Sequence, residues 1–108
     1  MNKVLITGRI SNIRPINNGN AFNVAVYDGI ANDNTIKTVF IECVCFGNTS
    51  KFLQKHFSVG RAIELIGKIS NSKYEKEGVT KYSTNVIVEE IGFVKSDRRE
   101  PELEKVAI

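Results

Sequence analysis

The stretch TVFIECVCFG, residues 38–47, alternates between two kinds of side chain in a way that is typical of a β-strand. Side chains alternate between the two faces of a strand, so every second residue points the same way. One face is small and apolar, as a core requires: Val39, Ile41, Cys43 and Cys45. The other face combines two large rings with a charge: Phe40, Glu42, Val44 and Phe46.

The rings on the second face allow two interpretations. Rings on an open sheet face can stack on unpaired nucleic-acid bases, because every base presents a π-face. Alternatively, both faces of the strand are buried, and Phe40 and Phe46 belong to the core. The strand pattern alone leaves both interpretations open.

The length and composition are those of one globular domain, with 108 residues, 42% of them hydrophobic and 25% charged. No apolar run has the length of a membrane span, and the N-terminus shows no secretion signal, so we expect a cytoplasmic protein. The net charge of +3 is a weak indication of a nucleic-acid partner. Residues 1–95 carry twelve basic and eight acidic side chains, so this part is more basic than the total suggests.

The two cysteines, Cys43 and Cys45, are spaced i, i+2 on one strand, which is a poor geometry for a disulfide. A zinc site within the chain would lack ligands, because His56 is the only histidine. We therefore expect buried free thiols in a reducing compartment, and no metal or cofactor. A thiol enzyme that pairs a cysteine with His56 is the alternative class. The core-facing cysteines argue against it, so no catalytic residue is expected.

Five strands and one helix are expected along the chain, followed by a short flexible tail at 96–108. The strands are predicted at 4–10, 22–27, 35–46, 61–70 and 82–94, with a bend or bulge at Gly8 and a break at Glu89–Glu90. The helix is expected to begin at an Asn48 or Thr49 cap and to close at Gly60. Loops are expected at 12–20 and 28–34, and a charged hairpin tip at 72–81 that turns near 77–78.

This order predicts an all-β fold, a five-stranded Greek-key barrel of the OB type with one short helix between strands 3 and 4. In that fold, the face of strands 2 and 3 and the 1–2 and 4–5 loops bind oligonucleotides. Tyr27, Phe40 and Phe46 fall on strands 2 and 3, and Tyr74 falls in the 4–5 loop. Pattern and topology thus converge on one surface.

Six ordered segments of residues 1–95 also resemble the bacterial and phage single-stranded DNA-binding protein (SSB) family: residues 2–10, 22–26, 40–47, 60–67, 73–78 and 81–86. The resemblance implies a non-enzymatic protein that binds and protects single-stranded DNA, without sequence preference, during replication, recombination and repair. It also implies a homotetramer in which strand 1 pairs between subunits, with a dimer as the alternative. The host would be a bacterium, or a phage acting in its host's cytoplasm.

The resemblance carries roles to individual positions. Phe40 and Phe46 match the family's stacking positions, Tyr74 matches the aromatic of the 4–5 loop, and Lys3, Arg9 and Lys73 match basic or polar positions near the DNA. We expect Tyr27 to join the stacking set. The side chains expected to attract the DNA backbone are Lys3, Arg9, Lys51, Lys68, Lys73, Lys76 and Lys81.

Two further interpretations concern residues near this set. The lysines that flank Tyr74, namely Lys73, Lys76 and Lys81, form the best single cluster, although they would equally suit a solvated hairpin. Tyr82 is interpreted as a structural residue or a subunit contact, and His56 as a packed histidine on the helix's apolar stripe.

Several residues depart from the family pattern. Ile30 stands where another stacking aromatic is frequent, Glu42 where a polar or basic residue is common, and Ser70 and Ser72 where some members have arginine. These departures predict weaker binding, because each lost stack costs roughly 1–3 kcal/mol. The tail lacks the acidic tip that recruits replication and recombination proteins, so such partners differ or are absent. Two alternative functions stay open: an OB-fold protein adaptor of a primosome type, and a strand-annealing recombination mediator.

Overall fold

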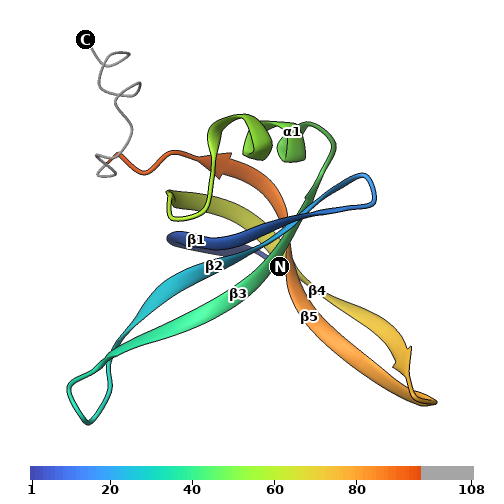
Figure 1. The fold of residues 1–108 in the computed structure, drawn as a ribbon, viewed down its shortest axis with the longest axis horizontal. Helices are drawn as coiled ribbons and strands as arrows, with labels where there is room; N and C mark the ends of the chain where they lie inside the picture. Colours follow the sequence, from blue (N-terminus) through green and yellow to red (C-terminus); the bar gives the residue numbers. More distant parts are fainter. Residues whose placement is uncertain (96–108) are drawn as a thin grey trace.

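The computed structural model describes residues 1–95, and the predicted tail lies outside the described residues. The elements follow in the order β1 (Val4–Ile16), β2 (Gly19–Ile30), β3 (Ile36–Phe46), α1 (Gly47–His56), β4 (Ala62–Lys76) and β5 (Val79–Gly92). The strands close into a barrel in the order β1-β2-β3-β5-β4 (Figure 1). The predicted five-stranded barrel of the OB type, with its helix between strands 3 and 4, is confirmed.

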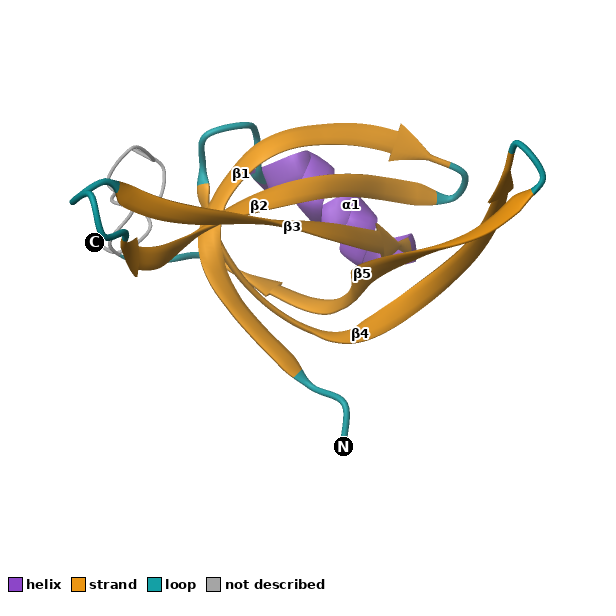
Figure 2. Ribbon diagram, turned by 90° about the horizontal axis from the view of Figure 1, so that it is seen from below, coloured by secondary structure: helices purple, strands orange, loops and turns teal. Residues whose placement is uncertain are grey.

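Strand pairing explains how the barrel closes. β1 serves two neighbours, because Val4–Arg9 pairs with β4 and Arg9–Ile16 pairs with β2. β3 and β5 meet in a short parallel contact at Cys43–Val86 and Val44–Ile87. The β2–β3 and β4–β5 hairpins extend well beyond the barrel and diverge, while α1 lies at the opposite end (Figure 1). Seen from below, the helix lies behind the strands (Figure 2).

The core is built from the inward-facing residues of the strands and one face of α1. Phe22, Val24, Cys43, Cys45 and Leu53 are completely buried. Fully burying a large apolar side chain contributes about 1.5–3 kcal/mol, so these positions stabilise the barrel strongly. The predicted core face of β3 holds only in part, because Val39 is 40% exposed. At Val39 the β2–β3 hairpin has already left the barrel, and both of its faces meet solvent.

The β1–β2 hairpin is longer than predicted. The sequence predicts a loop at 12–20, but β1 continues to Ile16 and the chain turns at Asn17–Asn18, where Asn18 has a φ of 65°. Pro15 fits this strand because β1 pairs there only with β2, so its missing N–H breaks no ladder bond on the other edge. The bulge expected at Gly8 lies instead between Ile10 and Asn12.

The β4–β5 hairpin is also strand where the sequence predicts a tip at 72–81. Its turn at Glu77–Gly78 lies at the predicted place, and both residues have positive φ, 54° and 77°. Such a two-residue turn has the twist that continues two antiparallel strands. The break predicted at Glu89–Glu90 is a bulge, since Ile66 pairs with Glu90 and Gly67 with Val88.

The ends of α1 differ from the prediction. The helix begins at Gly47 with Phe46 as N-cap and no side-chain capping bond, so neither Asn48 nor Thr49 is the cap. The chain reverses at Gly47, whose φ is 59°, a value that glycine adopts without a Cβ penalty. The helix ends at His56, four residues before Gly60.

An aromatic cluster fixes the end of α1 to the chain that follows β5. The His56 ring is half-buried and lies 4.6 Å from the Phe52 ring and 5.6 Å from the Phe93 ring, centroid to centroid. Arg61 is buried with its guanidinium 5.0 Å from the Phe57 ring and 4.8 Å from the Phe93 ring, and its Nη1 donates to the carbonyl of His56. The packed histidine is confirmed. Within residues 1–95 no helix is long and apolar enough to cross a membrane.

Candidate nucleic-acid interface

Three of the predicted stacking residues lie on the outer surface of β2 and β3. Residues directly opposite each other in an antiparallel pair share a face. Phe40 pairs with Ala25, Phe46 with Gly19 and Thr38 with Tyr27. The exposed fractions are 63% for Phe40, 46% for Phe46 and 64% for Tyr27. The interpretation of Phe40 and Phe46 as core residues is therefore wrong.

The rings are spread along the face. Tyr27 lies opposite Thr38, two residues from Phe40, so Tyr27 and Phe40 are diagonal neighbours, about 7–8 Å apart at the backbone. Phe46 lies six residues beyond Phe40, roughly 20 Å at about 3.3 Å per residue. Rings at this separation can hold bases that are not neighbours in a strand.

Gly19 lets the Phe46 ring settle against β2. A Cβ at Gly19 would lie 2.9 Å from Phe46 Cδ1 and 2.1 Å from the carbonyl oxygen of Cys45. Only a glycine allows both approaches. Phe46 is also the last residue of β3 and the N-cap of α1, so two elements fix its backbone.

The outer surface continues from β3 onto the β4–β5 hairpin. Val44 of β3 pairs with Ile87 of β5, and Ile87 pairs with Lys68 of β4. Because side chains alternate along both strands of the hairpin, Tyr74 and its partner Lys81 lie on the same surface. Tyr74 is 46% exposed. We call the surface that carries these four rings the outer aromatic face: Tyr27, Phe40, Phe46 and Tyr74.

The lysines of the hairpin divide between its two faces. Alternation places Lys68, Lys76 and Lys81 on the outer aromatic face. Lys73 pairs with Tyr82 on the reverse face, so the predicted cluster around Tyr74 loses this lysine. Tyr82 is 69% exposed and does not pack into the core. The interpretation of Tyr82 as a structural residue is therefore wrong, whereas its interpretation as a subunit contact stays a prediction.

Two other predicted basic residues, Lys3 and Lys51, lie away from the rings, whereas Arg9 lies on the same face as Phe40. Lys3 Nζ lies 3.4 Å from Glu89 Oε1, in an ion pair at the β5 bulge. Arg9 pairs with Ala25, the β2 partner of Phe40, and its Nη1 donates to the carbonyl oxygen of Gly60 at 3.1 Å. Lys51 is on α1, at the end of the barrel away from the hairpin tips (Figure 1).

Arg14 is a basic residue of this surface that the sequence prediction misses. It pairs with Ala21 on β2, and its Nη2 lies 3.2 Å from Glu42 Oε2 across that strand. The predicted loop at 12–20 hides it, because a loop has no defined face. If the chain is taken to turn at Asn17–Asn18, the pairing of β1 with β2 follows back from that turn and puts Arg14 opposite Ala21.

The tip of the β2–β3 hairpin carries an exposed apolar pair. Ile30 pairs with Ile36, and they are 65% and 71% exposed. Thr35 closes the tip by donating its N–H and its hydroxyl to Asp33 Oδ1, at 3.1 Å and 2.6 Å. These hydrogen bonds hold the pKa of the Asp33 carboxyl below its usual range.

The two cysteines are buried free thiols, as predicted. Burial raises the pKa of the Cys43 thiol to about 12 and also raises the pKa of the Cys45 thiol. The thiolate is the reactive form of cysteine, so both side chains are poor nucleophiles at neutral pH.

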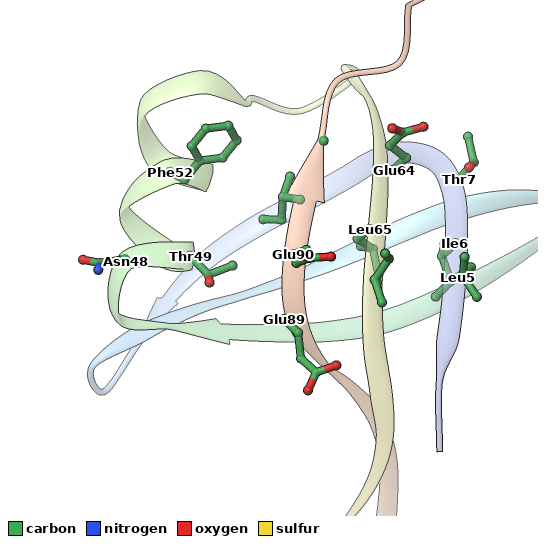
Figure 3. Close-up of a pocket in the computed structure, with 13 residues that line it drawn as sticks. Leu5, Ile6, Thr7, Asn48, Thr49, Phe52, Glu64, Leu65, Glu89 and Glu90 are labelled. Atoms are coloured by element: carbon green, nitrogen blue, oxygen red, sulfur yellow. The ribbon is translucent and has the colours of Figure 1, made fainter. Parts of the chain in front are cut away.

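A hollow of about 630 Å³ lies elsewhere, between α1 and the strands β1, β4 and β5 (Figure 3). Its walls combine apolar side chains such as Leu5 and Phe52 with the carboxylates of Glu64, Glu89 and Glu90. Like charges repel, so this hollow is unsuited to a phosphate backbone. None of the predicted stacking residues lines it.

Comparison with known proteins places the chain in a family. The single-strand binding protein family matches over residues 1–94. A single-stranded DNA-binding protein of Staphylococcus epidermidis is 34% identical over 100 residues, a match that covers 87% of this chain and 76% of that protein. One of Fusobacterium nucleatum is 33% identical over 97 residues, covering 82% of this chain and 62% of that protein.

A solved structure gives the same result for the fold. The Plasmodium falciparum SSB in complex with ssDNA superimposes with a TM-score of 0.71 at 21% identity, covering 88% of this chain and 96% of that chain. With a closed barrel of the same fold and a family match along the described residues, the chain belongs to the single-strand binding protein family.

Proposed function

We propose that this protein binds single-stranded DNA without sequence preference and protects it during replication, recombination and repair. The observation that carries the proposal is the outer aromatic face, on which four rings stay exposed along one continuous surface. Exposed rings beside lysines are what sequence-tolerant single-strand binding requires. The names of the two bacterial relatives support the same ligand.

The mechanism combines stacking with charge neutralisation. Bases stack on Tyr27, Phe40, Phe46 and Tyr74, and each stack contributes about 1–3 kcal/mol. Lys68, Lys76 and Lys81 neutralise phosphates, which releases counterions and makes the affinity depend on salt. No bond of the DNA is made or broken, so the proposed role is binding and not catalysis.

The other predicted basic residues keep a smaller part in the proposal. Lys3, Lys51 and Lys73 lie off the outer aromatic face, and Arg9 lies on it beside Ala25. All four add to the positive potential that attracts a strand from a distance.

Assembly and location also belong to the proposal. Among residues 1–95, the segment Val4–Gly8 pairs only with β4, so its other edge is free to pair with a second copy. We propose a homotetramer built on such pairs, with a dimer as the smaller assembly. The buried free thiols suit a reducing compartment, and we place the protein in the cytoplasm. Replication or recombination proteins are its proposed protein partners.

A double substitution tests the proposal and separates it from a protein adaptor. Phe46→Ala combined with Tyr74→Ala removes two stacking rings and leaves the core untouched, so binding of an oligo-dT should be abolished while the melting temperature stays near that of the wild type. Val59→Ala is the matched control, because Val59 is a similarly exposed apolar residue between α1 and β4. Unchanged oligo-dT affinity in the double variant would show that this face serves another ligand, such as a protein.

A further inference from the structure

We propose that the Arg14–Glu42 ion pair regulates the affinity of the outer aromatic face for single-stranded DNA. In the free protein Glu42 holds Arg14, and in the complex a DNA phosphate takes over the guanidinium. This inference rests on the proposed function, and it assigns roles to two residues that lie between the stacking rings.

The position of Glu42 carries the first step. It shares a face of β3 with Phe40 and Phe46, two residues from the first ring and four from the second. At about 3.3 Å per residue, the carboxylate lies roughly 7 Å and 13 Å from them along the strand. A nucleic-acid strand that stacks on both rings therefore passes over Glu42.

The electrostatics of this stretch carry the second step. A carboxylate under a phosphate backbone repels it. The β2 residues beside it on the same face, Ala21, Asn23 and Ala25, are uncharged and offer no compensation. Arg14 supplies it from β1, with its Nη2 3.2 Å from Glu42 Oε2. Arg14 thus neutralises the charge of Glu42, which would otherwise repel a DNA strand that passes over it.

The exposure of the pair carries the third step. The Arg14 and Glu42 side chains are 51% and 36% exposed. Exposed ion pairs contribute little to stability, so this one opens readily. A guanidinium binds phosphate with the same two-pronged geometry that it uses for a carboxylate. Arg14 can therefore exchange one anion for the other without leaving the surface.

The exchange has a measurable signature. Arg14 is occupied in the free protein, so part of the free energy of its phosphate contact is used to release Glu42. Removing the carboxylate should free Arg14 and strengthen binding. Removing Arg14 alone should weaken binding twice over, because it takes away a phosphate contact and also uncovers Glu42. The two substitutions should therefore be strongly non-additive.

Fluorescence anisotropy with a labelled oligo-dT, over a series of salt concentrations, tests the proposal on Glu42→Gln, Arg14→Gln and the double variant. Glu64→Gln is the control, because it makes the same charge change in the acidic hollow away from the rings. Glu42→Gln should bind about two- to tenfold more tightly than Glu64→Gln at low salt. Its plot of log affinity against log salt should keep the slope of Glu64→Gln, because Arg14 contacts a phosphate in both complexes, whereas Arg14→Gln should flatten the plot by about 0.7, one phosphate contact fewer on a single strand.

The outcomes separate this inference from the proposed function. If the wild type binds but Glu42→Gln matches Glu64→Gln in affinity, or Arg14→Gln keeps the wild-type salt slope, the inference is wrong and the proposed function stands. The inference is also wrong if Arg14→Gln lowers the affinity for oligo-dT by the same factor in the wild type and in the Glu42→Gln variant. If the wild type itself binds no oligo-dT, the proposed function is lost and the inference with it.

Discussion

At the scale of single residues, the informative contrast lies within β3. Cys43 and Cys45 are fully buried, while Phe40 and Phe46, which are larger and more apolar, face solvent. Fully burying a phenylalanine would stabilise the fold by about 1.5–3 kcal/mol. Phe40 and Phe46 gain only part of this free energy, because both stay exposed. Phe40 and the neighbouring Tyr27 form one exposed aromatic pair, and Phe46 lies further along the same face, an arrangement that suits the proposed stacking of bases.

The two faces of the β4–β5 hairpin provide a matched pair of substitutions. Tyr74 and Tyr82 are both exposed tyrosines opposite a lysine, but only Tyr74 lies on the outer aromatic face. Tyr74→Ala should weaken oligo-dT binding about five- to 100-fold, the loss of one stack, as measured by anisotropy. Tyr82→Ala should change it less than about twofold. An equal loss in both variants would contradict the assignment of faces.

The raised pKa of Cys43 predicts a stability loss in alkali. The thiol of an unfolded chain ionises with an ordinary pKa of 9.0, whereas folded Cys43, with its pKa raised to about 12, keeps its proton well above that pH. Between these values the folded state binds more protons, so its stability falls as pH rises, by at most about 1.4 kcal/mol per pH unit. Urea denaturation from about pH 8 to about pH 10 should show a weaker fall for Cys43→Ala than for the wild type. Parallel curves would contradict this.

At the scale of elements, close backbone approach between strands decides which glycines matter. A Cβ at Gly8 would lie 2.4 Å from the carbonyl oxygen of Ala25, a backbone atom of β2 that cannot move aside. Gly8→Ala should therefore lower the free energy of unfolding by about 1–3 kcal/mol. At Gly92 the nearest atom is Glu64 Oε1, at 3.0 Å on a flexible side chain, so Gly92→Ala should cost much less. Urea midpoints measure both, and similar losses would mean that backbone approach is not the deciding factor.

The tip of the β2–β3 hairpin offers a gain of function. Ile30 is 65% exposed at the tip of the hairpin that carries Tyr27 and Phe40, so Ile30→Trp should add a stack and tighten oligo-dT binding about fivefold or more. The chain has no other tryptophan, so quenching of the new fluorescence on titration reports the contact directly. Val59→Trp is the control away from the hairpins. Fluorescence that is no more quenched at the tip than at Val59 would contradict the placement of the strand.

Strands with alternating apolar residues could be predicted from the sequence, whereas the parts of strands without this alternation could not. The predicted order of the elements and the Glu77–Gly78 turn are correct because alternation and turn residues are local signals. The extension of β1 to Ile16 and of the β4–β5 hairpin to its turn escapes prediction. The added part of the β4–β5 hairpin is mostly polar and exposed, so hydrophobic periodicity cannot reveal it. The added part of β1 packs Ile13 against the core, but the turn-forming residues around Ile13 mask the strand pattern.

At the scale of the whole molecule, the register of strand pairing decides which side chains lie together on the outer aromatic face. The placement of the four rings on the exposed surface could be predicted from the sequence, because each lies on a strand or hairpin with a defined place in the predicted fold, and their stacking role stays a prediction. The sequence could not place Arg14 beside Glu42, because that contact spans three strands and follows only from the pairing of β1 with β2 and of β2 with β3. The sequence could not show for a similar reason that Lys73 lies on the face of the hairpin opposite Tyr74, since this follows only from its pairing with Tyr82, and its role in binding stays a prediction.

The closed barrel also separates two charge environments. The rings and the lysines Lys68, Lys76 and Lys81 lie on the outer aromatic face, whereas the hollow beside α1 is lined by Glu64, Glu89 and Glu90. A polyanion is therefore directed to one side of the molecule and repelled from the other. We thus expect a single path for the strand on each copy of the chain.

Single-strand binding by the outer aromatic face is tested most directly by an anisotropy titration of a labelled oligo-dT of about 35 nucleotides, at about 50 and about 200 mM salt, with an unlabelled duplex of equal length as competitor. Stacking on exposed rings requires unpaired bases, and phosphate contacts require counterion release. We therefore predict tight binding that weakens at the higher salt and that the duplex does not displace. Absence of binding at the lower salt, or displacement by the duplex at equal concentration, would contradict single-strand binding by this face.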